Sequence, residues 1–250
     1  MPYKNQKFCW FGIISTDVDR AKAFYTEALG WSTMTMTMGE TEATMFVAGG
    51  VPIAHLSSPA MPGIPSHWNN YFRVKDVDAS AKAAKKHGGD IALPPTDIPP
   101  GRFSVITSPS GAALSLFHEA DSSSENAPEG EGSICWTELH STDIEADLKW
   151  LSAALAVESE STPMPDGDYY MLKGESGPAG GAMSQRTDGA PAYWLSWVAV
   201  ADVDATLERV TRHGGKGLTP IFEADKVGRM AVVADPTGAA FGIITLAKHG

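Results

Sequence analysis

The pattern of apolar and polar residues repeats one order of elements four times: a β-rich strand, an amphipathic helix and three short strands. In the first unit, Phe8–Ser15 is β-rich and bounded by polar residues, which predicts a strand. Asp17 then caps a helix that stops at Gly30, a residue suited to a left-handed end. Its apolar face comprises Ala21, Phe24, Tyr25, Ala28 and Leu29. Three strand candidates follow within Ser32–Ser57.

The same order restarts at Asn70–Lys75, with Asp76 or Asp78 as the cap of the second helix. The third unit begins with the strand Ile134–Ser141 and the helix Asp143–Ala156. The fourth begins with the strand Trp194–Val200 and the helix Val203–Arg212. The other strands of these units are expected at IALP, FSVIT, ALSLF, Tyr169–Lys173, Gly180–Ser184, LTPIF, RMAVVA and AFGIITL.

The chain contains an internal duplication. Cys9–Trp31 reads CWFGIISTDVDRAKAFYTEALGW, and Cys135–Val157, about half the chain later, reads CWTELHSTDIEADLKWLSAALAV. Cys-Trp, Ser-Thr-Asp and the apolar helical stripe occur at the same offsets in both copies and therefore report the fold. The second copy differs by carrying Glu138 and His140, so these two positions are where specialisation is expected.

The two halves are joined by His118–Ser133, a segment rich in Ser, Gly, Pro and acidic residues with almost no apolar side chain. This composition is typical of a solvated connector. We therefore expect an α+β protein with a first domain at residues 1–117, a linker at 118–133 and a second domain at 134–250. Each domain contains two βαβββ units.

Composition excludes several function classes. The net charge of −11 argues against nucleic acid as a partner, because binding a phosphate backbone needs clustered Lys and Arg. No stretch approaches the length of a membrane span, and the N-terminus lacks the apolar run of a signal peptide, so a cytoplasmic protein without a membrane partner is expected. Two cysteines, Cys9 and Cys135, make a disulfide framework improbable and favour a packing role.

The unit order, the phrase Ser-Thr-Asp-Val-Asp-Arg-Ala-Lys-Ala-Phe-Tyr of residues 15–25, the HGG helix ends and the turn Asp235-Pro-Thr-Gly238 together resemble the vicinal oxygen chelate superfamily. That superfamily includes glyoxalase I, bleomycin-resistance proteins and extradiol dioxygenases. The resemblance covers nearly the whole chain outside the linker. It implies two glyoxalase-like domains, a tandem arrangement in which mixed sheets curl into incomplete barrels around cups. Many members hold a divalent metal in the cup.

The resemblance also implies where metal ligands would stand, and this chain departs from the pattern there. The four family positions fall on Trp10, His55, Asn69 and Ser115 in the first copy. In the second copy they fall on Trp136, Gly181, Leu195 and Gly242. Of these, His55 alone is a metal-type side chain, whereas a catalytic metal needs about three protein ligands. We therefore predict no cofactor, with a divalent metal as the alternative.

Trp136, Glu138 and His140 alternate along one strand and so point to the same face. If that face is a cup, Glu138 and His140 are candidate catalytic residues for proton transfer. Asn69 and Ser115 would complete this cup if the two halves pack as family units do. The alternative interpretation is that Glu138 and His140 satisfy each other in a polar patch.

The other cup would hold Trp10, His55, Leu195 and Gly242, with His55 as a hydrogen-bonded lining residue. Trp10, His55, Asn69, Ser115 and Trp136 are thus the candidate substrate-binding residues, and the composition suits a small-molecule pocket.

Whether the protein is an enzyme stays open at this point. The primary hypothesis is a metal-independent glyoxalase-like protein that binds a small organic ligand and performs isomerase- or lyase-type proton transfer. One alternative is a metal-dependent lyase or dioxygenase that recruits non-standard ligands. The other is a sequestering protein of the bleomycin-resistance type. A monomer can form both cups, so a homodimer is compatible with the sequence but not required.

Overall fold

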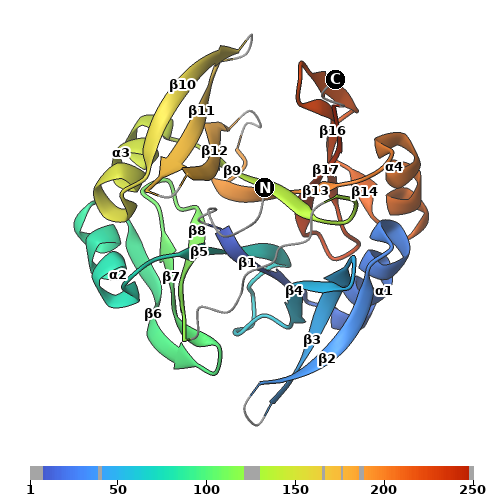
Figure 1. The fold of residues 1–250 in the computed structure, drawn as a ribbon, viewed down its shortest axis with the longest axis horizontal. Helices are drawn as coiled ribbons and strands as arrows, with labels where there is room; N and C mark the ends of the chain where they lie inside the picture. Colours follow the sequence, from blue (N-terminus) through green and yellow to red (C-terminus); the bar gives the residue numbers. More distant parts are fainter. Residues whose placement is uncertain are drawn as a thin grey trace. The chain divides into compact units, whose positions relative to one another are not determined.

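The computed structural model describes residues 8–38, 41–120, 130–164, 167–175, 177–185 and 189–247. It confirms the α+β class and the four βαβββ units, arranged in two sheets of eight and nine strands that do not close into barrels (Figure 1). The predicted linker is described at 118–120 and 130–133 only, and the last strand of the first half continues to Glu119.

The first half contains eight strands and two helices. Its elements are β1 (Phe8–Ile14), α1 (Val18–Leu29), β2 (Ser32–Met38), β3 (Thr41–Ala48), β4 (Val51–Ser57), β5 (His67–Arg73), α2 (Val77–Lys86), β6 (Asp90–Ile98), β7 (Gly101–Thr107) and β8 (Ala113–Glu119).

The second half repeats this order, except that the strand directly after its second helix is split into two short strands. Its elements are β9 (Ile134–Ser141), α3 (Ile144–Leu155), β10 (Glu158–Met164), β11 (Gly167–Gly174), β12 (Gly177–Ser184), β13 (Tyr193–Ala199), α4 (Val203–Arg212), β14 (Lys216–Gly217), β15 (Phe222–Ala224), β16 (Gly228–Ala234) and β17 (Ala240–Leu246).

Both sheets follow the same strand order. The first runs β2-β3-β4-β1-β5-β8-β7-β6 and the second β10-β11-β12-β9-β13-β17-β16-β14, with β15 added beside β16. Within each unit the first strand pairs in parallel with the last, as β12 does with β9, and the remaining neighbours are antiparallel. The first strand of every unit is therefore central, which places the residues of β9 deep in its sheet.

Each helix starts at an aspartate at the predicted place. Asp17, Asp76, Asp143 and Asp202 each accept a hydrogen bond from the backbone N–H three residues later. The cap of α2 is thus Asp76, one of the two candidates from the sequence. Helix α1 ends at Gly30 with φ 70°, and α3 ends at Ala156 with φ 52°, a left-handed conformation that an L-alanine adopts with strain.

Contacts divide the chain into two compact units, each of which combines parts of both halves. The first compact unit comprises residues 1–10, 69–126 and 137–194, and the second comprises residues 11–68, 127–136 and 195–250. Helices α2 and α3 pack together in the first unit, and α1 and α4 pack together in the second. Glu138 and His140 belong to the first unit.

In the first compact unit, a buried carboxylate on α3 joins the helix to the turn that precedes β8. Asp147, which has no solvent exposure, accepts hydrogen bonds from the Ser141 hydroxyl (2.7 Å) and from the backbone N–H of Ser110 (3.1 Å). The Ser110 hydroxyl donates to the same carboxylate. Trp150 of α3 donates to the carbonyl of Ala84 in α2 (3.0 Å), so both helices are fixed through polar contacts as well as packing.

The second compact unit has a corresponding junction between a helix and a turn, but there the buried carboxylate stands on the turn and not on the helix. Asp235 precedes β17 and accepts a hydrogen bond from the hydroxyl of Tyr25 on α1 (3.1 Å), while Trp68 Nε1 donates to that same hydroxyl (2.9 Å). Burial and the neighbouring Asp235 charge raise the pKa of Tyr25 well above its usual value. Rings of Trp31, Phe46 and Phe241 surround Tyr25.

Two strands differ from the sequence prediction. No strand was expected between the third helix and Tyr169, but β10 covers Glu158–Met164, with all seven of its residues exposed on the sheet edge. This strand lacks the apolar pattern used for prediction and contains Pro163. Polar residues and proline are both tolerated in an edge strand. The strand expected at LTPIF is interrupted at Pro220, which has no N–H for the ladder, so that β14 and β15 lie on either side of it.

Candidate functional site

The site is built on β9, where Trp136, Glu138 and His140 alternate as the sequence predicted. Pairing with β12 places Gly181 opposite Glu138 and Met183 opposite His140. Pairing of β12 with β11 continues these rows to Met171 and Tyr169 respectively. Because directly paired residues of adjacent strands share a face, Tyr169 and His140 lie on the same side of the sheet.

Glu138 and His140 form a hydrogen-bonded pair. His140 Nε2 lies 3.0 Å from Glu138 Oε1, and the exposed fractions of the two residues are 9% and 6%. A carboxylate only accepts hydrogen bonds, so Nε2 carries the proton and donates it. In the neutral imidazole, Nδ1 is then left with its lone pair, and within the described chain it has no partner.

The other carboxylate oxygen is held by a tyrosine that the sequence analysis did not select. Tyr169 Oη donates to Glu138 Oε2 at 2.9 Å. Its ring reaches Glu138 by crossing Gly181, where an added Cβ would lie only 1.9 Å from Oη. The absence of a side chain at Gly181 is therefore what allows Tyr169 to reach Glu138.

A second tyrosine covers the imidazole. Tyr193, at the start of β13, stacks on His140 with ring centroids 4.9 Å apart and an interplanar angle of 10°. Burial and the charge of Glu138 raise the pKa of Tyr193, and a hydrogen bond with Gln185 acts in the opposite direction.

Asn69 and Ser115, predicted to complete this cup, bind each other on the other sheet. Ser115 Oγ donates to Asn69 Oδ1 at 2.7 Å, linking β8 to β5. Burial raises the pKa of the neighbouring Tyr71 to about 12, partly offset by a hydrogen bond with Asn69. Because these residues and the Glu138–His140 pair belong to different sheets, their membership of one cup stays a prediction.

His55 has the surroundings of a lining residue. It stands on β4 opposite Gly12 of β1, and its ring lies over Gly12, where an added Cβ would be 2.4 Å from Cε1. Burial lowers the pKa of His55 to about 4, although a hydrogen bond with the Phe11 backbone acts in the opposite direction. His55 is therefore neutral at physiological pH. Of the other residues proposed with it, Trp10 shares its sheet, while Leu195 and Gly242 lie on β13 and β17.

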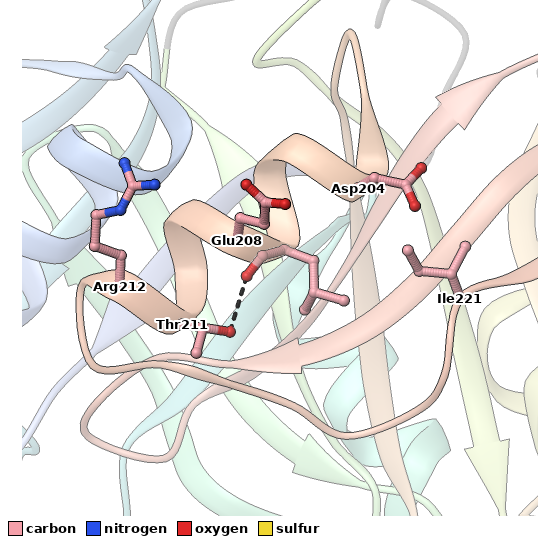
Figure 2. A pocket seen from close by; sticks show the side chains of 6 residues that line it. Asp204, Glu208, Thr211, Arg212 and Ile221 are labelled. Carbon is pink, nitrogen blue, oxygen red and sulfur yellow. Dashed lines mark hydrogen bonds between the residues drawn. The ribbon is translucent and has the colours of Figure 1, made fainter.

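A shallow groove on the surface lies elsewhere, along the outer face of α4. Figure 2 shows its lining, in which Thr211 donates a hydrogen bond to the carbonyl of Leu207 (2.9 Å) within the helix. The other lining residues are Asp204, Glu208, Arg212 and Ile221. The groove contains no side chain that the sequence analysis selected.

The model for the glyoxalase/bleomycin resistance protein/dioxygenase superfamily matches residues 7–116 and again residues 107–243. The chain belongs to this superfamily. Among relatives in the superfamily, the putative glyoxylase CFP32 of Mycobacterium tuberculosis is 31% identical over 242 residues, covering 94% of this chain and 93% of that protein. The anthracycline biosynthesis protein DnrV of Streptomyces peucetius is 28% identical, covering 95% and 92%.

Solved structures of superfamily members share the fold at low identity. The Mn(II)-bound glyoxalase from Novosphingobium aromaticivorans aligns with a TM-score of 0.64 and 16% identity, covering 98% of this chain and 85% of that one. The 2,3-dioxygenase LapB from Pseudomonas sp. KL28 aligns with a TM-score of 0.63 and 12% identity, covering 98% and 93%.

Two of the positions at which the resemblance places metal ligands do not fit a metal. Gly181 and Gly242 offer no ligand atom, and the rings of Tyr169 and Trp197 lie over them. Glu138, the carboxylate of the site, has one oxygen hydrogen-bonded to His140 and the other to Tyr169. Within the described residues, no cluster of three or more His, Cys, Asp or Glu side chains could bind a metal ion.

Cys9 and Cys135 are free thiols that donate to the carbonyls of Tyr71 and Trp197, and burial raises the pKa of Cys135 to about 11. Both are therefore protonated and suited to packing rather than to nucleophilic chemistry.

In the described part of the chain, no helix is long and apolar enough to span a membrane.

Proposed function

We propose that the protein binds a small organic molecule beside His140 and transfers a proton to and from it without a divalent metal. The observation that carries this proposal is the hydrogen-bonded series Tyr169–Glu138–His140, which directs one imidazole nitrogen toward a carboxylate and leaves the other as a base. A base oriented by a second group that is itself held in place is the arrangement used for general base catalysis.

The roles of the two residues selected from the sequence become distinct. His140 accepts the substrate proton at Nδ1 and later returns it. Glu138 keeps the proton on Nε2 and stabilises the imidazolium that forms, so it positions the base rather than acting as a second one. Tyr169 fixes the carboxylate in that orientation.

The proposed reaction class is an isomerisation or elimination that starts with removal of a proton from a carbon acid. The names of the relatives, a putative glyoxylase and anthracycline biosynthesis proteins, are both consistent with an organic small molecule as the ligand. The aromatic side chains of Tyr169 and Tyr193 favour an apolar or aromatic one.

Deuterium exchange into phenylacetone tests this proposal without knowledge of the natural substrate. In D₂O, removal of a methylene proton by the base and return of a deuteron is followed by ¹H NMR. We expect saturable exchange that falls at least tenfold in His140→Ala and also falls in Glu138→Gln. His87→Gln, which changes an exposed histidine at the C-terminal end of α2, is the matched control and should leave exchange unaltered.

Exchange that is equally fast in His140→Ala would refute the catalytic role. Binding of phenylacetone without exchange would instead favour the sequestering alternative, in which the Glu138–His140 pair serves only to line the pocket.

A further inference from the structure

The strands around the proposed site carry an excess of negative charge. Strands β9 to β12 contain four carboxylates and a single lysine, namely Glu138, Glu158, Glu160, Asp168 and Lys173. Lys173 forms an ion pair with Glu160 at the sheet edge. Its charge is therefore neutralised locally and is not directed toward Glu138.

Glu138 itself is held by an imidazole and a phenol. In the described chain, its hydrogen bonds come from His140 and Tyr169, and no Lys or Arg lies within ion-pair distance of it. A carboxylate buried to 6% exposure is poorly screened by solvent. The negative charge of Glu138 therefore disfavours an anion bound beside His140.

Within the residues that the structure describes, Nδ1 of His140 is the polar atom of the pair without a hydrogen-bond partner, and it is an acceptor. With Nε2–H donated to Glu138, His140 presents the lone pair of Nδ1, which favours a ligand with an O–H or N–H to donate. The adjacent rings of Tyr193 and Tyr169 supply a flat, apolar border that suits an aromatic ring.

We propose that the site selects a neutral aromatic molecule that donates a hydrogen bond to Nδ1 of His140, and that Glu138 excludes carboxylate and other anionic ligands. This inference rests on the proposed function and specifies the ligand class of the same site. It assigns Glu138 a second role, in specificity, beyond orienting the base.

Three naphthalene compounds of the same ring size test the proposal. 2-Naphthol is neutral and donates, 2-methoxynaphthalene is neutral and cannot donate, and 2-naphthoate is an anion. Each is titrated into the intact protein at neutral pH by calorimetry, and the imidazole resonances of His140 are followed by NMR to locate the bound ligand. Glu138→Gln is the matched variant, because glutamine keeps the shape and can still accept from Nε2 while losing the charge.

In the wild-type protein we expect 2-naphthol to bind at least tenfold more tightly than 2-naphthoate and more tightly than 2-methoxynaphthalene. In Glu138→Gln the preference for 2-naphthol over 2-naphthoate should shrink at least threefold, because 2-naphthoate binds better. A site that rejects the anion simply by being apolar would show the same preference in both proteins, and that result would overturn the proposal.

Equal or tighter binding of 2-naphthoate by the wild-type protein would also overturn the inference. In that case persistence of phenylacetone exchange would leave the proposed function intact. Failure of all three compounds to perturb His140, together with absence of exchange, would overturn the inference and the proposed function at once.

Discussion

Replacing Gly181 by alanine tests whether the glycine is there to admit the ring of Tyr169. The backbone of Gly181 is not in the left-handed region, so alanine is conformationally acceptable. The new Cβ would lie 1.9 Å from Tyr169 Oη and 2.5 Å from Cζ, whereas ordinary contact begins at 3.4 Å. The ring must therefore move by about 1.5 Å, which breaks its 2.9 Å hydrogen bond with Glu138.

The expected loss of stability follows from these two effects. A hydrogen bond to a charged group contributes about 1.5–3 kcal/mol, and overpacking costs about 1–3 kcal/mol, with some of the strain relieved as the ring moves away. We expect Gly181→Ala to lower the free energy of unfolding by about 2–4 kcal/mol, measured by urea denaturation.

A double-mutant cycle with Tyr169→Ala isolates the ring from the backbone. The first copy has Ala43 at the position that matches Tyr169, so Tyr169→Ala gives the second copy the residue found in the first. Without the ring, Gly181→Ala should be neutral or slightly stabilising, since alanine has less conformational freedom to lose than glycine. An equal destabilisation in both backgrounds would show that the backbone, not Tyr169, requires glycine, and would refute the reasoning.

Three further predictions concern stability. Ala156→Gly should stabilise the protein by about 1 kcal/mol in urea denaturation, because φ 52° suits glycine, whereas Gly30→Ala at the matching helix end should destabilise it by a similar amount. The free energy of unfolding should fall by about 3 kcal/mol as the pH drops from 6.5 to 4, because His55 has a pKa of about 4 in the folded chain and the unfolded chain therefore binds a proton there first. His55→Gln should lack this part of the pH dependence. An unchanged pH dependence in that variant would contradict the prediction. Tyr25→Phe should lower the free energy of unfolding by about 1–3 kcal/mol because it leaves Oδ2 of buried Asp235 without its donor, and a loss below 0.5 kcal/mol would contradict this.

Much of the fold could be predicted from the sequence because its signals are local. Aspartate caps, glycine stops and alternating apolar strands recur in each unit, so the order of elements follows from pattern alone. Strand β10 was not predicted, because an exposed edge strand needs no apolar face and so shows no alternating apolar pattern. The internal duplication contained the missing information, since Glu158–Met164 stands where the first copy has Ser32–Met38.

The candidate site could be predicted only in part. Comparison of the two copies singled out Glu138 and His140, and the structure shows that these two side chains are hydrogen-bonded. Tyr169 and Tyr193 were missed because their contacts depend on strand pairing and ring direction. The same comparison applied further would have found them, since the first copy has Ala43 and His67 at the matching positions. Which groups approach Nδ1 of His140 depends on tertiary structure rather than on local pattern.

The two buried junctions, with Asp147 on a helix in one and Asp235 on a turn in the other, have a consequence for how the duplicated halves can associate. Each junction joins an element of the N-terminal half to one of the C-terminal half. Two N-terminal halves would bring α1 to a serine turn with no carboxylate. Two C-terminal halves would place both aspartates in one buried junction, where like charges repel. After duplication the halves have thus become complementary partners, and neither can replace the other.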